Sequence, residues 1–310
     1  MNSPPFSANL LTDLQQMLHY QFMQHAFEAG TVVAIIAGIV GYFVVLRRSA
    51  FASHALSHIG FAGAAGAVLL GANPIFGLLT FTCGGGVGMA VLGPRAVNRD
   101  VQIGTVLAFM LGLGVLFISL YTGYATEAYS ILFGEILGIS SSDVLVTVTA
   151  SLIILAAVGI MYRPLLFASL DEDVAEAKGL SMPLLGMIFM LLLAVAVSIA
   201  VQIVGVLLIF SLMVTPAAIA QRLAKRPRSV MIISVLIALM ATWSSLFIAF
   251  YEPYPVSFFI TSIIFVSYLF VRFVYPSRIC LVCRKKFNSL SLSKHVEKKH
   301  PTTFPTEDKS

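Results

Sequence analysis

Long apolar stretches, separated by short polar segments, dominate the chain from residue 30 to residue 274. They recur at about 30–46, 55–71, 75–93, 102–124, 143–162, 184–201, 204–220, 229–250 and 255–274. Each approaches the ~20 residues that an α-helix needs to cross a bilayer, and tilting accommodates unequal lengths. The pattern predicts an all-α, polytopic membrane protein with eight or nine transmembrane helices, in a transmembrane domain at residues 30–275.

Three segments depart from this pattern. Residues 9–28 place apolar side chains at roughly helical spacing among Gln and His, so residues 1–29 are predicted to form an amphipathic segment on the membrane surface. Residues 129–140 are apolar but too short to span, which indicates an outer-surface or re-entrant helix. Pro216 removes a helix hydrogen bond, so we expect a break or kink near the inner face. It is either a gate hinge or simply part of a span that ends before the basic loop at 222–228.

The basic residues indicate the orientation of the spans. If residues 163–182 are cytoplasmic, alternation of the spans places all eleven Lys and Arg of residues 1–275 on that same side. This is the distribution that the positive-inside rule describes. The outer loops then hold only acids, and the tail that follows residue 275 is predicted to be cytoplasmic.

The composition excludes a water-soluble globule, because 58% of the residues are hydrophobic and only 11% are charged. The net charge of +5 comes wholly from residues 276–310, which hold eight Lys or Arg and three Asp or Glu. The run Gly84-Gly85-Gly86 is not followed by the Lys-Ser/Thr of a phosphate-binding loop. We therefore expect these glycines to serve helix packing, and the chain to hydrolyse no nucleotide through a P-loop of its own.

Two of the six histidines, His54 and His58, lie four residues apart in the second apolar stretch. That spacing puts both imidazoles on one helix face. An ionisable group inside a bilayer is costly, about 2.5–3.5 kcal/mol for a central charge, so the pair indicates a functional site, and metal binding is one interpretation of it. If the helix begins just after Arg48, they lie about 9 and 15 Å along it. The alternative is that both histidines hydrogen-bond to neighbouring helices, with Ser53 and Ser57 as partners.

The loop at 164–180 reads PLLFASLDEDVAEAKGL. Asp171, Glu172 and Asp173 place acids at the positive end of a short helix that continues through Glu176, and Gly179 stands where a helix-ending glycine is expected. The loop is either an ordinary helix at the membrane surface or a docking element for a soluble partner.

The tail at 276–310 holds four potential zinc ligands, Cys280, Cys283, His295 and His300, in the pattern C-x2-C-x11-H-x4-H. Two thiolates and two imidazoles make a closed structural zinc site chemically reasonable, so zinc is the predicted cofactor. A lone finger is a poor reader of DNA, and no nucleic acid is expected as a partner. The basic tail is instead predicted to contact an ATPase, a partner permease or anionic membrane lipid, or to regulate transport.

Three motifs together resemble the permease subunit of metal-ion ABC importers, which move zinc, manganese or iron(II) inward. They are RR-x5-HALSH-x-G-x2-G, the acidic loop at 164–180, and VGVLL-x6-TPAAIAQRLAK, and the resemblance covers about residues 17–274. It implies the ABC importer permease fold in a bacterial cytoplasmic membrane, and a transporter subunit rather than an enzyme. It also implies a homodimer, an extracytoplasmic metal-binding protein, and a separate ATPase that contacts residues 171–180 as its coupling helix.

Members of that family commonly show Asp-Ala-Leu-Ser-His where this chain has His54 to His58, and the Asp and His are thought to contact the metal. Here His54 occupies the Asp position. Two neutral imidazoles suit zinc better than manganese, so zinc is the first predicted substrate, with manganese or iron(II) as alternatives. Two imidazoles do not complete a tetrahedral set, and Gln202 is a weak further candidate. The rival interpretations are a siderophore or corrinoid permease and a membrane-anchored zinc sensor that signals through its tail.

Overall fold

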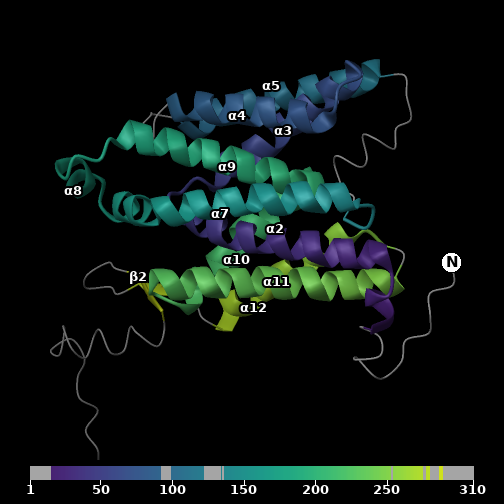
Figure 1. Ribbon diagram of the computed structural model, residues 1–310. Helices are drawn as coiled ribbons and strands as arrows, with labels where there is room; N and C mark the ends of the chain where they lie inside the picture. The colour runs from purple at the N-terminus through teal and green to yellow at the C-terminus, as the bar shows by residue number, and fades with distance from the viewer. Residues whose placement is uncertain are drawn as a thin grey trace, which may run out of the picture.

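The computed structural model describes residues 15–91, 99–121, 134, 136–252, 254–274, 277–279 and 286–288. These residues form α-helices and one small antiparallel hairpin (Figure 1). In chain order the elements are α2 (Gln21–Leu46), α3 (Ala50–Leu69), α4 (Pro74–Val91), α5 (Arg99–Leu120), α7 (Ser141–Leu170), α8 (Glu172–Ala177), α9 (Met182–Val204), α10 (Val206–Leu223), α11 (Pro227–Tyr251), α12 (Val256–Val274), β1 (Ser277–Ile279) and β2 (Lys286–Asn288).

Eight helices among the described residues are long and apolar enough to cross a membrane, namely α2, α4, α5, α7, α9, α10, α11 and α12. Helix α3 has the length of a span, with 20 residues, but its two histidines and two serines lower its hydropathy and it falls outside this set. It runs beside α4 and α5 (Figure 1). The predicted all-α, polytopic fold with eight or nine transmembrane helices is confirmed.

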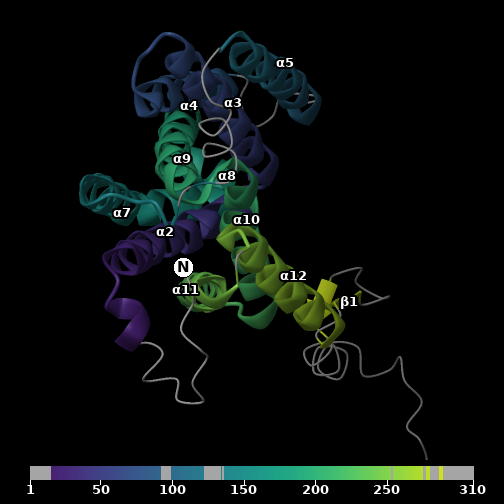
Figure 2. The ribbon, with the colours of Figure 1, turned by 90° about the vertical axis from the view of Figure 1, so that its right-hand side faces the viewer.

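The helices form a layered bundle around α2. Seen from the end, α3, α4 and α5 form one group, and α4 joins this group to α9 (Figure 2). Helix α2 packs against α7, α9, α10 and α11, while α12 lies on α10 and α11. Little of α2 touches α3, although the two follow one another in the chain. The α3 group therefore attaches to the rest of the bundle through α4, α9 and α10.

Glycines set how closely several helices approach. A Cβ on Gly63 of α3 would meet the backbone oxygen of Gly77 on α4, so the two backbones touch where they cross. The predicted packing role of the glycine run is confirmed at Gly85, next to Ile59, and at Gly86, next to Met190. At Gly84 a Cβ would meet no atom within 4 Å. Only part of the run therefore serves helix packing.

Helices α9 and α10 meet at Gly205, whose φ of 85° lies in the left-handed region that favours glycine. Gly134 packs against the backbone of Val204 and Gly205, where a side chain would collide. The predicted break near Pro216 is absent, because α10 runs through Pro216 as one helix and ends seven residues later at Leu223. The other prediction, a span that ends where the basic loop at 222–228 begins, agrees with the end of α10 at Leu223.

The predicted surface segment at 1–29 is divided in the structure. Residues 21–29 are the first turns of α2, a membrane-length helix, and residues 15–18 form a separate helical turn before it. Residues 1–14 lie outside the described residues. The predicted short helix at 129–140 also lies largely outside them, and its described residues, 134 and 136–140, form a turn and irregular backbone and no helix.

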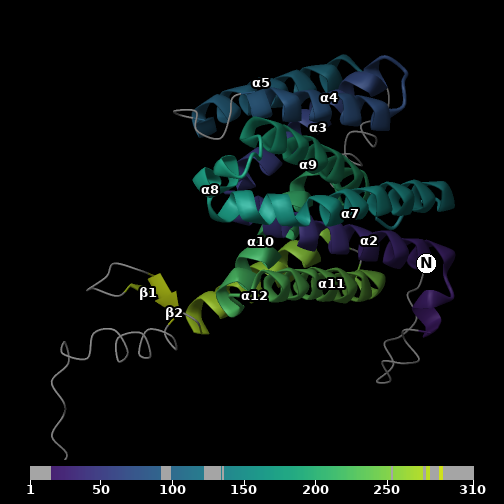
Figure 3. The same cartoon turned by 60° about the vertical axis from the view of Figure 1, so that its left-hand side comes forward.

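Helix α8 and the β1–β2 hairpin lie at the same end of the bundle, and α2 begins at the opposite end (Figure 3). We call the first of these the α8 end. The hairpin pairs Ile279 with Lys286 and Ser277 with Asn288. The four predicted zinc ligands of the tail lie outside the described residues.

Candidate functional site

The two histidines of α3 lie in its first half, nearest the α8 end. Helix α3 begins at Ala50, one residue later than the helix start assumed from the sequence. At 1.5 Å of rise per residue, His54 and His58 therefore lie about 6 and 12 Å along it. Both are shallower than predicted, but they remain within the helix and one turn apart.

The burial pattern shows which way these histidines face. Every residue from Ala52 to Ala65 is buried except His54 and His58, which are half-buried. Since the two lie on one helix face, this face is the side of α3 that the chain itself leaves partly uncovered. The two imidazoles are thus the only residues of this stretch, 52–65, that reach the surface of the chain.

The rings pack on each other and on one aromatic side chain. The ring centres of His54 and His58 are 4.7 Å apart, with their planes at 85°. Phe210 of α10 lies 5.1 Å from His54, again nearly edge-on. Helix α10 therefore supplies an apolar wall beside the pair, which limits water around the imidazoles on that side.

Neither histidine is satisfied by the hydrogen bonds that the sequence suggested. Ser53 donates to the carbonyl of Ala50 at 2.9 Å and Ser57 to that of His54 at 2.7 Å, so both hydroxyls serve their own helix. The Nδ1 atoms of His54 and His58 are buried and have no hydrogen-bond partner among the described residues. An unsatisfied buried polar group costs about 1–3 kcal/mol. Each half-buried ring therefore keeps one enclosed nitrogen that no other described group satisfies.

The described part of the chain does not complete a metal site by itself. It contains no group of three or more His, Cys, Asp or Glu side chains placed to hold one ion. The amide of Gln202 donates instead to a carboxylate oxygen of Asp143 at 3.4 Å. The pair on α3 is therefore half of a ligand set at most.

Helix α8 has the limits that the sequence predicts. A carboxylate oxygen of Asp171 accepts from the backbone N–H of Val174 at 3.1 Å, which caps the start of the helix. Gly179, with φ of 83°, donates to the carbonyl of Glu176, and Leu180 donates to that of Ala175. These two bonds form the Schellman motif, so the predicted C-terminal glycine is confirmed.

The surface of α8 is available to a partner. Ala175 is fully buried and anchors the helix, whereas Asp171, Asp173 and Glu176 are exposed and Glu172 is half-buried. The helix lies between the end of α7 and the start of α9, at the α8 end of the bundle (Figure 1). It presents a short acidic surface whose shape is fixed by its own caps.

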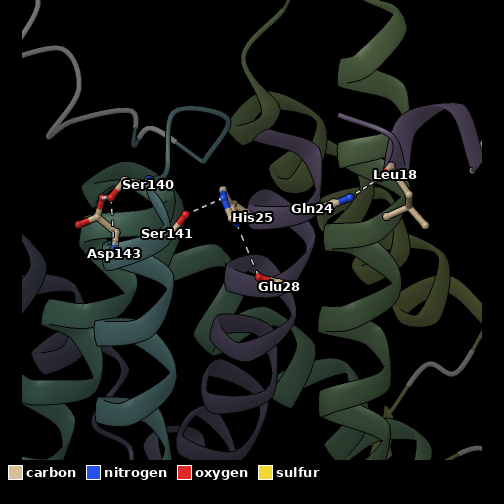
Figure 4. Close-up of polar contacts among 7 residues, drawn as sticks. All are labelled: Leu18, Gln24, His25, Glu28, Ser140, Ser141 and Asp143. Carbon is tan, nitrogen blue, oxygen red and sulfur yellow. Dashed lines mark hydrogen bonds and ion pairs between the residues drawn. The ribbon is translucent and has the colours of Figure 1, made fainter. Parts of the chain in front are cut away.

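A polar cluster ties α2 to α7 at the opposite end of the bundle (Figure 4). The Nε2 of His25 lies 3.1 Å from the hydroxyl of Ser141, and its Nδ1 lies 3.8 Å from Glu28. Ser140 and Asp143 form a capping box at the start of α7. The capping box has a local sequence pattern, but no local pattern pairs His25 with a residue 116 positions away.

A hollow of about 340 Å³ lies among α3, α4, α7 and α9. Its lining is largely apolar and includes neither His54 nor His58. Ser198, in its wall, lies 2.5 Å from Thr82 in a buried hydroxyl pair. Two other polar side chains of its lining also bond within the protein, because Asn73 accepts from the backbone N–H of Ile75 and the amide nitrogen of Gln202 donates to Asp143.

Comparisons with known proteins support the fold and the membrane role. A model of the ABC 3 transport family matches residues 19–275, and it ends before the tail, whose predicted zinc site it does not support. Over 214 residues the chain is 32% identical to the manganese transport system membrane protein MntC of Listeria monocytogenes, covering 69% of this chain and 76% of that protein.

Two further proteins extend the comparison. The chain is 26% identical to the high-affinity zinc uptake system membrane protein ZnuB of Haemophilus influenzae, over 82% of this chain and 98% of that protein. Among solved structures, PsaBC from Streptococcus pneumoniae in complex with Fab contains a chain that superposes with a TM-score of 0.77. The two share 28% identity, and the match covers 86% of this chain and 97% of that one.

Proposed function

The chain belongs to the ABC 3 transport family as the permease subunit of a metal-ion ABC importer, and on that premise we propose that its cargo is a divalent transition-metal ion, zinc first. The observation that carries this proposal is the pair of partly uncovered imidazoles on α3, with their unpartnered Nδ1 atoms. Manganese and iron(II) are the alternative cargoes.

The choice of zinc rests on the donor atoms. Imidazole nitrogen suits zinc, copper, nickel and iron, while carboxylate oxygen is the donor that manganese prefers. His54 supplies a nitrogen donor without the negative charge of a carboxylate. The names of the relatives include both a manganese system and a zinc system, so relatedness alone leaves both metals open.

A second copy of the chain is the proposed source of the missing ligands. Two copies that meet through the face of His54 and His58 bring four imidazoles together across a two-fold axis. Four nitrogen donors match the coordination number that zinc prefers. This arrangement also accounts for the open side of α3, because the second copy covers the surface that the first leaves half-buried.

Helix α8 is the proposed docking element for a separate ATPase subunit. Its exposed acids, Asp171, Asp173 and Glu176, form a rigid surface that a cleft of opposite charge can hold. This role places the α8 end in the cytoplasm of a bacterial cell, together with the tail. The opposite end then receives the metal from an extracytoplasmic binding protein.

A separate proposal concerns the tail at residues 276–310. Cys280, Cys283, His295 and His300 are proposed to hold a structural zinc ion, on the strength of their spacing alone. The C280S/C283S variant should lose one bound zinc per chain in elemental analysis. Equal zinc content in the variant and the unaltered protein would refute the proposed zinc site in the tail.

Metal uptake by cells tests the proposed function. The chain is produced with its ATPase and binding protein in a strain that lacks its own zinc and manganese importers. We expect zinc accumulation, and a fall of at least about tenfold in H58A, since even groups outside the first ligand shell commonly change metal affinity 10–100-fold. The control is H19A, because His19 is exposed and lies before α2.

The two possible failures have different meanings. Full uptake by H58A would refute the assignment of the site while leaving the importer intact. Failure of the unaltered protein to accumulate zinc, manganese or iron would refute the proposed cargo. Equal losses in H58A and H19A would indicate a general effect on expression, which immunoblotting of the membranes detects.

A further inference from the structure

Arg47 stands at the junction between two parts of the molecule. It follows the last residue of α2, and His54 comes seven residues later on α3. It is one of two neighbouring arginines, and their side chains differ in environment. Arg47 is half-buried, whereas Arg48 is exposed.

The Arg47 side chain contacts both helices that flank α8. One guanidinium nitrogen, Nη1, lies 3.4 Å from the hydroxyl of Ser169 near the end of α7. The guanidinium carbon lies 5.0 Å from the ring centre of Phe189 on α9, in the geometry of a cation–π contact. Ser169 is three residues before α8 begins, and Phe189 is itself fully buried. A single side chain therefore meets the segments on both sides of α8.

The backbone around Arg47 passes directly into α3 through a stiff corner. The N–H of Arg47 donates to the carbonyl of Phe43, and that of Ser49 donates to Val44, both at 2.8 Å. The Ser49 hydroxyl donates to the Arg47 carbonyl at 3.3 Å, and Ser49 is only 4% exposed. Its own carbonyl accepts from Ser53 in the first turn of α3. A displacement of Arg47 is thus passed to the start of the histidine helix.

We propose that Arg47 is a positioning residue that couples α8 and the helices on either side of it, α7 and α9, to the metal-facing side of α3. The inference rests on the proposed function, because it assigns a route by which movement of α8 reaches His54 and His58. When the flanking ends of α7 and α9 shift with a docked ATPase, their contacts with the guanidinium move the corner at Arg47. The corner then shifts or rotates α3 and with it both imidazoles.

The chemistry of arginine suits this role better than that of lysine. A guanidinium is planar, so its edge can donate to Ser169 while its face stacks on Phe189. An ammonium group offers no such edge and face, and it is more strongly hydrated. R47K is therefore expected to retain the charge and lose most of the coupling.

The test measures metal moved per ATP hydrolysed, using the complete complex of permease, ATPase and binding protein in proteoliposomes. R47M should assemble and hydrolyse ATP but move at least about fivefold less zinc per ATP, the lower end of typical coupling between sites. R48M is the matched control, because it removes the neighbouring charge from an exposed position, and it should keep the unaltered ratio. F189L should lower the ratio as well.

Non-additivity decides whether the contacts act together. If Arg47 and Phe189 transmit one movement, R47M/F189L should lower the ratio no further than R47M alone. The proposal would be overturned if R47M kept the unaltered ratio of zinc moved per ATP, or if R48M lowered this ratio equally. It would also be overturned if the losses in R47M and F189L were fully additive in the double variant. If R47M does not assemble, R47K and F189L decide it by the same ratio. A wild-type complex that moves no metal at all would instead refute the proposed function.

Discussion

Helices α8 and α3 hold the two functions proposed for this permease, and they are built in opposite ways. Helix α8 has six residues, and its limits come from caps made by its own segment, at Asp171 and Gly179. Helix α3 has no side-chain cap and depends on its neighbours, since α4, α5, α9 and α10 bury all of residues 52–65 except the two histidines. The proposed docking element is thus locally determined, while the proposed cargo face is set by distant parts of the chain.

The largest expected effect is on the docking of the ATPase. E172K/D173K reverses two charges on α8 and should abolish co-purification of the ATPase with the permease. A charge in the first turn of a helix typically contributes about 0.3–1 kcal/mol, and up to about 2 kcal/mol where it is partly buried, so the isolated permease should still fold. Loss of docking without loss of folding is what a locally built surface predicts.

The control for this variant is D100K, which reverses an exposed acid in the first turn of α5. It should retain the ATPase. If E172K/D173K co-purified with as much ATPase as the unaltered permease, α8 would not be the docking element. The proposed contrast between α8 and α3 would then be wrong for α8.

A smaller effect is expected on the stability of the permease, and it tests whether α3 depends on packing against its neighbours. G63V places a side chain against the backbone of Gly77 and within 2.6 Å of the Cβ of Phe81, so α3 and α4 must separate. Overpacking of this kind costs about 1–3 kcal/mol and should lower the thermal midpoint of the purified permease. G84V, where nothing lies within 4 Å, is the control. Equal shifts would contradict the dependence of α3 on its close contact with α4.

The same contrast explains what the sequence could predict. Apolar runs of about 20 residues define spans without any tertiary information, and the eight candidate spans follow them. The start and end of α8 obey capping rules that act over three or four residues. The i, i+4 spacing likewise suffices to predict that His54 and His58 share one helix face.

Features that depend on distant contacts could not be predicted in this way. No local pattern pairs Arg47 with Ser169, or His25 with Ser141, because each pair comes together only when separate helices pack. The break expected at Pro216 is absent for a related reason. A proline disrupts an isolated helix, but the neighbouring helices of a membrane bundle allow α10 to continue through it.

The most direct test of the central claim changes a donor atom and asks which metal is transported. H54D replaces a nitrogen donor with a carboxylate, and H54N supplies an oxygen without the charge. If His54 contacts the cargo, H54D should shift the ratio of manganese to zinc uptake in proteoliposomes by at least about tenfold toward manganese, equivalent to about 1.4 kcal/mol, and H54N should shift it less. An unchanged ratio in H54D, with total transport retained, would show that the metal does not pass through this face of α3.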